Sequence, residues 1–200
     1  MNIANKLTFF RVIVVPFIVV FFVVDTGIQG IQEDFLKIAA AVLFILGAIS
    51  DGMDGYYARK YGMTSNFGKL WDPIADKILV SSTLICLLYY KMILPYTAII
   101  IISREFFVSG LRLVSIEQGK VIAASRLGKW KTTFQLIHII TLLVFVSFEI
   151  CFLRFLPNNH YTNLFNANYF YIIRLLEGLS IFFTVYSGLD YYIKNRKIEK

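Results

Sequence analysis

The chain has 200 residues, of which 58% are hydrophobic and 16% charged, and its mean hydropathy is +0.66. This composition excludes an ordinary soluble domain and indicates an integral membrane protein. The net charge of +7 fits the excess of basic residues in cytoplasmic loops of membrane proteins, and it also suits an anionic, phosphate-rich substrate. The two cysteines, Cys86 and Cys151, lie in apolar segments and indicate neither a disulfide framework nor a zinc site.

Six apolar segments alternate with polar connections along the chain. The segments predict membrane-spanning helices over residues 12–24, 35–59, 71–90, 93–111, 132–155 and 169–193. The connections at 25–34, 59–70, 112–131 and 156–168 are predicted loops, and Lys91 marks a short turn. The sequence therefore predicts an all-α integral membrane protein with six transmembrane helices in a single domain, residues 1–200.

Connections that are rich in lysine and arginine alternate along the chain with connections that are poor in them. The N-terminus, the 59–70 and 112–131 connections and the C-terminal tail are basic, whereas the other connections are not. Because basic loops stay in the cytoplasm, both termini and the 59–70 connection are predicted on that side. An apolar chain of this kind, without a transit peptide, is expected in a bacterial cytoplasmic membrane.

Four aspartates flank the 59–70 connection: Asp51, Asp54, Asp72 and Asp76. Carboxylates next to membrane segments are costly, so they indicate a function. Their spacing of three or four residues places them on one face of each of two helices. Carboxylates brought together would repel one another unless cations lie between them, and oxygen ligands favour hard cations such as Mg²⁺, Mn²⁺ or Ca²⁺. A pair of such ions is one known means of phosphoryl transfer.

Two other interpretations of these aspartates stay open at this point. They could belong to acidic loops whose spacing is accidental. They could also line the ion path of a divalent-cation transporter, although Arg59 beside such a path disfavours that interpretation.

The pattern D-x2-D-G-x2-A-R-x8-G-x3-D-x3-D runs from Asp51 to Asp76, and every defined position matches. It resembles the signature of the CDP-alcohol phosphotransferases. The resemblance implies a six-helix membrane enzyme, usually a homodimer, with two divalent cations, Mg²⁺ or Mn²⁺, held by the four aspartates. It also implies that Asp76 is the general base. The residues that it assigns to the CDP group within this pattern are Gly55, Ala58, Arg59 and Gly68.

The N-terminus resembles the phosphatidylglycerophosphate synthase branch of the same family, in which many members have proline where Ala4 stands. The resemblance implies that Asn5, Thr8 and Arg11 help to hold the nucleotide. The alternative is that Asn5 and Thr8 cap the first helix and that Arg11 reaches lipid phosphates.

Four basic residues near the fourth and fifth segments resemble the same branch: Arg104, Arg112, Lys129 and Lys131. The resemblance implies that they bind the phosphate of the acceptor, and a planar guanidinium suits that geometry. The alternative for the last three is ordinary loop charge. The sequence leaves the roles of Glu105, His138 and Asp190 undetermined.

Together these resemblances imply transfer of a phosphatidyl group from CDP-diacylglycerol to sn-glycerol 3-phosphate, which gives phosphatidylglycerol phosphate and CMP. The expected partners are these two substrates, the lipid bilayer and a second copy of the chain, with no nucleic acid. Serine, inositol phosphate, an aminoalcohol and phosphatidylglycerol stay open as acceptors. An uncharged acceptor would not need the four basic residues.

Overall fold

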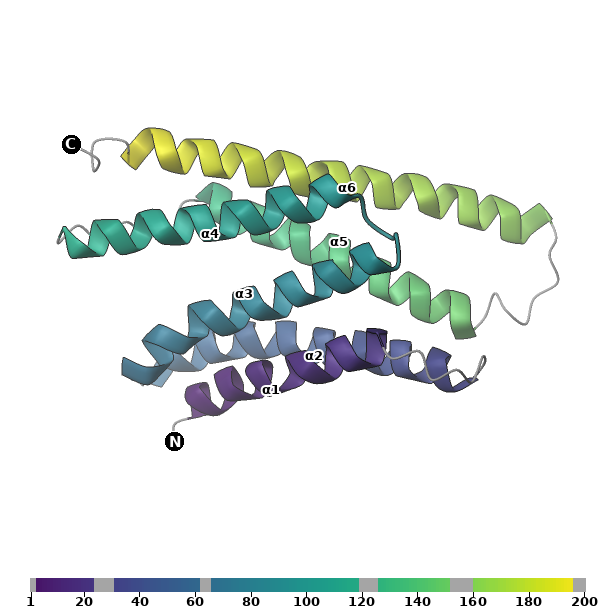
Figure 1. Ribbon diagram of the computed structural model, residues 1–200, viewed down its shortest axis with the longest axis horizontal. Helices are drawn as coiled ribbons and strands as arrows, with labels where there is room; N and C mark the ends of the chain where they lie inside the picture. Colours follow the sequence, from purple (N-terminus) through teal and green to yellow (C-terminus); the bar gives the residue numbers. More distant parts are fainter. Residues whose placement is uncertain (1–2, 24–30, 62–65, 119–125, 152–159, 196–200) are drawn as a thin grey trace. The chain divides into compact units, whose positions relative to one another are not determined.

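A computed structural model describes residues 3–23, 31–61, 66–118, 126–151 and 160–195 of the chain. Within these ranges all regular structure is helical, and Figure 1 shows the helices in chain order. The helices are α1 (Ile3–Val23), α2 (Ile31–Tyr61), α3 (Asn66–Tyr89), α4 (Pro95–Glu117), α5 (Arg126–Cys151) and α6 (His160–Asn195). The prediction of an all-α protein with six helices is confirmed.

The chain forms two compact units, which are described separately. Unit 1 comprises Met1–Met92 and Leu142–Leu156, and unit 2 comprises Ile93–Thr141 and Pro157–Lys200. Helix α5 therefore contributes its first part to unit 2 and its last part to unit 1. The prediction of a single domain over residues 1–200 stays a prediction.

In unit 1, α1 packs against both α2 and α3 (Figure 1). Its buried face carries Ile18 and Phe22, at the spacing by which helical residues share a face. Helices α2 and α3 approach at Gly47, where an added Cβ would lie 2.9 Å from a methyl carbon of Leu79. A small residue at this position permits the close helix–helix approach that is common in membrane bundles.

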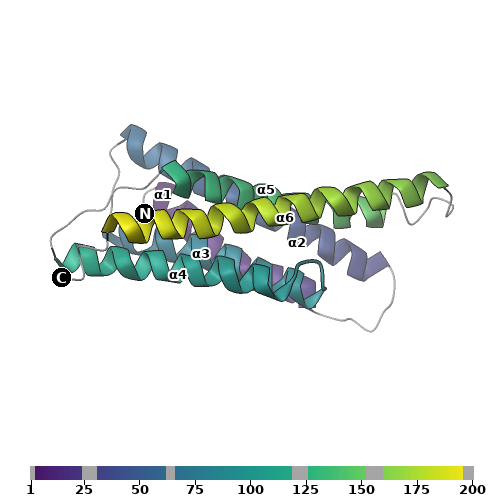
Figure 2. The same cartoon turned by 90° about the horizontal axis from the view of Figure 1, so that it is seen from above.

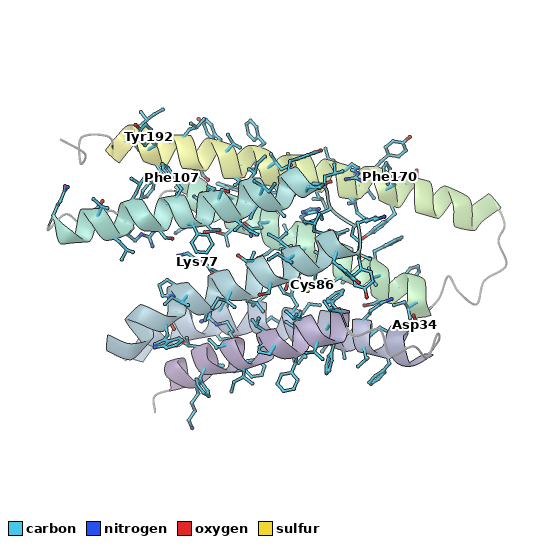
Figure 3. The ribbon with its side chains drawn as sticks, in the orientation of Figure 1. Asp34, Lys77, Cys86, Phe107, Phe170 and Tyr192 are labelled. Atoms are coloured by element: carbon cyan, nitrogen blue, oxygen red, sulfur yellow. The ribbon has the colours of Figure 1, made fainter. Side chains whose placement is uncertain are left out.

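In unit 2, α4 and α6 lie side by side (Figures 1 and 2). The carboxylate of Glu177 on α6 accepts hydrogen bonds from the backbone N–H of Leu94, at 3.1 Å, and from the Thr97 hydroxyl, at 2.6 Å. It thereby satisfies donors at the start of α4, which would otherwise be left without partners. Further along both helices the rings of Phe107 and Tyr192, which Figure 3 labels, have centroids 6.2 Å apart. The two helices therefore run in the same direction.

Large apolar side chains are exposed on all six helices, among them Phe17, Leu46, Ile85, Phe106, Val144 and Phe182. Such a surface is suited to lipid rather than water. Helices α1, α2, α5 and α6 contain stretches long and apolar enough to cross a membrane: Lys6–Val23, Asp34–Met53, Leu127–Phe148 and Asn168–Lys194. In the described residues, α3 and α4 contain no stretch that is as apolar, because the charged residues of the candidate site lie within them. That α3 and α4 also cross the membrane, which would make six crossings, therefore stays a prediction.

The helices extend further than the apolar segments predict. The predicted loop at 112–131 is wrong at both ends, since α4 continues to Glu117 and α5 begins at Arg126. The predicted loop at 156–168 is wrong from His160 onwards, because α6 begins there. Hydropathy marks only the part of a helix that lies in lipid. The extended ends of α4 and α5 contain arginine, lysine and glutamate, which are good helix formers and let a helix continue past that part.

Candidate functional site

The aspartate pattern occupies the end of α2 and the beginning of α3. Asp51, Asp54, Gly55, Ala58 and Arg59 lie in the last turns of α2, and Gly68, Asp72 and Asp76 lie in the first turns of α3. For Asn5, Asp54, Gly55, Ala58, Arg59 and Gly68 the described structure comprises the helical backbone alone. Predictions about the side chains in that list fall outside the described residues.

Two of the four aspartates meet at one arginine of α1. Nη1 of Arg11 lies 2.6 Å from Oδ1 of Asp51, and its Nη2 lies 4.0 Å from Oδ1 of Asp72. The Thr8 hydroxyl donates a hydrogen bond to the same oxygen of Asp72. We call Thr8, Arg11, Asp51 and Asp72 the aspartate cluster. The structure thus brings together residues from three helices that the sequence predicted for one site.

Burial within the aspartate cluster is uneven. Thr8 and Arg11 are fully buried, whereas the side chains of Asp51 and Asp72 are each 42% exposed. A buried guanidinium is costly unless a charged partner compensates it, so Arg11 depends on the two aspartates. The carboxylates stay accessible from outside the cluster.

These contacts overturn the alternative interpretation for Thr8 and Arg11 of the first helix. Thr8 lies in the second turn of α1, which begins at Ile3, so its hydroxyl does not cap the N-terminus. Arg11 is fully buried against Asp51, so it does not extend to lipid phosphates. Whether Thr8 and Arg11 contact a nucleotide stays a prediction.

The aspartate cluster suits a hard divalent cation in its donor chemistry. Carboxylates from two different helices face the same cationic group, and both are partly open. Asp76 lies one turn after Asp72 on α3 and is partly exposed; Lys77, labelled in Figure 3, follows it. Among the described side chains there is no group of three or more histidine, cysteine or acidic residues placed to hold a metal ion. Asp54 is not among those side chains, so the full ligand set stays a prediction.

An apolar groove borders the aspartate cluster. Thr8, Phe9 and Val12 of α1 and Trp71 of α3 line it. Trp71 precedes Asp72 directly in the chain, and both Trp71 and Phe9 are exposed. An apolar surface thus lies next to the carboxylates.

A second charged group lies in unit 2. Oε1 of Glu105 on α4 contacts Nζ of Lys131 on α5, and Oε2 of Glu105 lies 3.7 Å from Nη1 of Arg104. Nη2 of Arg104 donates a 3.0 Å hydrogen bond to the Ser187 hydroxyl on α6. We call Arg104, Glu105, Lys131 and Ser187 the basic cluster. The exposed fractions of the three charged side chains are 13% for Arg104, 21% for Glu105 and 0% for Lys131.

The structure separates the four predicted phosphate-binding residues into two pairs. Arg104 and Lys131 meet through Glu105 in the interior of unit 2. Arg112 and Lys129 are exposed, and Arg112 lies about 12 Å along α4 from Arg104 at 1.5 Å per residue. Arg112 lies in α4 and Lys129 in α5, so neither belongs to the loop that the sequence predicted at 112–131.

Sequence reasoning gave no role to the two residues that connect the side chains of the basic cluster. Glu105 and Ser187 join Arg104 to its neighbours, and no spacing rule connects positions on different helices. The signal that was available is a glutamate next to an arginine within an apolar segment. Asp190, whose role the sequence left undetermined, pairs with Lys194 on its own helix at 2.7 Å. His138 is fully buried on α5.

Comparison with known proteins decides the family. A family model described as CDP-alcohol phosphatidyltransferase matches residues 1–186. The chain belongs to this family. This membership confirms the resemblance drawn from the aspartate pattern.

Relatives from several bacteria carry one name, CDP-diacylglycerol–glycerol-3-phosphate 3-phosphatidyltransferase. A protein of Bacillus subtilis with this name is 39% identical over 97% of this chain and 95% of its own length. One from Mycoplasma genitalium is 33% identical over 96% of this chain and 83% of its own. One from Rickettsia typhi is 37% identical over 72% of this chain and 76% of its own. The match to the Bacillus subtilis protein is long enough to include both the aspartate cluster and the basic cluster.

Proposed function

We propose that the protein transfers the phosphatidyl group of CDP-diacylglycerol to sn-glycerol 3-phosphate, giving phosphatidylglycerol phosphate and CMP. The observation that carries this proposal is the similarity, over 97% of the chain, to a relative named for that reaction. In the reaction a hydroxyl oxygen of the acceptor bonds to the phosphatidyl phosphorus. The bond from that phosphorus to the bridging oxygen breaks, and CMP leaves with the electron pair.

The aspartate cluster is assigned to the donor. Asp51, Asp54, Asp72 and Asp76 would hold two divalent cations, Mg²⁺ or Mn²⁺, which when bound neutralise charge on the pyrophosphate and on the departing CMP. The convergence of Asp51 and Asp72 on Arg11, and their partial exposure, support this assignment. Arg11 and Thr8 keep the two carboxylates in place. Asp76 accepts the proton of the attacking hydroxyl.

The remaining donor contacts are proposed from the family pattern. Gly55, Ala58 and Gly68 let the cytidine group approach the helix backbones, while Asn5 and Arg59 contact its polar groups. The apolar groove beside Asp72 supports a lipid substrate, because it offers acyl chains an apolar surface next to the carboxylates.

The acceptor phosphate is assigned to the basic residues of unit 2: Arg104, Arg112, Lys129 and Lys131. Arg104 and Lys131 together carry one more positive charge than Glu105 compensates. A phosphate dianion compensates that charge, whereas serine or another acceptor without a phosphate does not. This difference supports glycerol 3-phosphate over uncharged acceptors.

The setting proposed for the reaction is a bacterial cytoplasmic membrane. We propose a multi-pass homodimer in which the aspartates face the cytoplasm. The exposed apolar surfaces of the helices and the bacterial relatives support a membrane location. The basic residues near the aspartate pattern support the orientation.

CMP release by the purified protein in detergent tests the proposed function. The protein is supplied with CDP-diacylglycerol and Mg²⁺ or Mn²⁺, and glycerol 3-phosphate, serine and inositol phosphate are compared in parallel. We expect release that requires both glycerol 3-phosphate and the metal ion, and phosphatidylglycerol phosphate as the lipid product. Release with serine alone would contradict the assignment of the basic cluster. The cation-transport interpretation has no support from the family, and CMP release would exclude it as the sole function.

A further inference from the structure

We propose that Glu105 is a positioning residue for the acceptor phosphate, which holds Arg104 and Lys131 next to each other as a pair of cations. The inference deepens the proposed function, because it rests on the assignment of these two residues to the acceptor. Nothing in the family pattern of aspartates gives Glu105 a role.

Lys131 is buried against Glu105. Its side chain is fully buried on α5, and its ammonium group contacts Oε1 of Glu105, which lies 26 residues earlier on α4. A buried ammonium ion is costly unless an anion compensates for its lost hydration. The carboxylate in contact provides this compensation and holds the ammonium group against α4. Glu105 therefore fixes the place of Lys131.

Arg104 is confined by its neighbours. Its guanidinium is held on one side by Glu105, at 3.7 Å, and on the other by the Ser187 hydroxyl, at 3.0 Å. That hydroxyl donates its own proton to the backbone oxygen of Thr184 at 3.1 Å, so it accepts from Arg104 in a defined orientation. The side chain of Arg104 also lies against Gly188, where an added Cβ would come 3.3 Å from Cγ of Arg104. Few other positions are open to this guanidinium.

The charges of Arg104, Glu105 and Lys131 do not cancel. Glu105 neutralises one of the two cations, so the three side chains keep a net positive charge. A carboxylate next to a phosphate site also repels the phosphate. Positioning and repulsion therefore predict opposite effects of removing the Glu105 charge. Repulsion alone predicts tighter binding of glycerol 3-phosphate, whereas positioning predicts weaker binding.

Steady-state kinetics of Glu105→Gln distinguishes the two effects. In the CMP-release assay we expect KM for glycerol 3-phosphate to rise about 10-fold, the size of a lost hydrogen bond to a charged group. We expect KM for CDP-diacylglycerol to stay within about 2-fold, because the donor is assigned to unit 1. Glu105→Asp keeps the charge and should recover part of the loss.

Glu177→Gln is the matched control. Glu177 is a buried glutamate of unit 2, with Thr97 and Arg174 as partners, and it has no assigned role in the reaction. This variant should lower the unfolding temperature and leave KM for glycerol 3-phosphate unchanged. If Glu105→Gln does not fold, Ser187→Ala replaces it, because it removes only the hydroxyl that holds Arg104. We expect a several-fold rise of the same KM.

A lower or unchanged KM for glycerol 3-phosphate in folded Glu105→Gln would overturn the positioning role. An unchanged KM in Ser187→Ala would do so when only that variant folds. The wild-type protein tests the proposed function separately in the same assay. If its CMP release does not depend on glycerol 3-phosphate, the proposed function fails, and this inference fails with it.

Discussion

The aspartate cluster of unit 1 and the basic cluster of unit 2 combine charged side chains in opposite proportions. In the aspartate cluster one arginine, Arg11, faces two carboxylates, and in the basic cluster one carboxylate, Glu105, faces two cations. Each cluster therefore contains its own counter-charge and keeps an excess of one sign. The excess is negative where we assign metal ions and positive where we assign the acceptor phosphate.

The two clusters differ in how open they are. The carboxylates of the aspartate cluster are 42% exposed, whereas no charged side chain of the basic cluster is more than 21% exposed. A cation can thus reach Asp51 and Asp72 without displacing their present partners. A phosphate must instead compete with Glu105 and Ser187 for Arg104. Repulsion among its carboxylates therefore governs cation binding by the aspartate cluster. The way in which Arg104 and Lys131 are held governs phosphate binding by the basic cluster.

The largest effect is expected from Asp76→Asn. Loss of a general base typically lowers turnover by about 10²- to 10⁴-fold, and loss of a proposed metal ligand adds to this. CMP release measures the effect, and the unfolding temperature should change little because Asp76 is partly exposed. Asp34→Asn is the matched control, since Asp34 lies on α2 about 25 Å from Asp51 at 1.5 Å per residue. Substantial turnover in Asp76→Asn would remove Asp76 from the role of base.

Arg11→Ala tests whether the aspartate cluster binds cations. Without the guanidinium, Asp51 and Asp72 repel each other, and we expect a destabilisation below the roughly 3–5 kcal/mol of a fully buried broken pair, because both carboxylates are partly exposed. Divalent cations should restore part of the loss by replacing the missing charge.

Thermal unfolding in detergent, with Mg²⁺ and with a chelator, measures the response of Arg11→Ala. We expect Mg²⁺ to raise the unfolding temperature of this variant more than that of the wild-type protein. An equal response to Mg²⁺ would show that the cation does not bind at these carboxylates.

Thr8→Val tests the hydrogen bond to Asp72 while it keeps the shape of the side chain. Loss of a group that orients a metal ligand typically lowers metal affinity by about 10- to 100-fold, so half-maximal CMP release should require correspondingly more Mg²⁺. Thr8→Ser keeps the hydroxyl and should behave as the wild-type protein does. An unchanged Mg²⁺ requirement in Thr8→Val would show that Thr8 contributes packing and does not orient Asp72.

The smallest effect is expected from Arg112→Ala. Arg112 is exposed, so its contact with a phosphate competes with water, and we expect KM for glycerol 3-phosphate to rise by about 10-fold at most. Lys194→Ala is the control, because Lys194 is an exposed basic residue of unit 2 that pairs with Asp190. Equal effects of the two substitutions would indicate general surface charge rather than a phosphate contact.

The sequence by itself determined the all-α character, the six helices, the place of the aspartate pattern and the family. Local properties suffice for these features, since apolar length marks a helix in lipid and carboxylate spacing marks its face. Hydropathy did not determine where the helices end. It follows the boundary with lipid, whereas hydrogen bonding continues α4 past Arg112 and starts α6 at His160.

Only the tertiary structure decided which charges meet. Arg11 and Asp51 are 40 residues apart, and Lys131 and Glu105 are 26 residues apart. No rule of spacing connects residues on different helices, because their contact depends on how the helices pack and rotate. Burial likewise depends on neighbours from elsewhere in the chain. For that reason, only the tertiary structure showed that Arg11 and Lys131 are fully buried while Asp51 and Asp72 stay open.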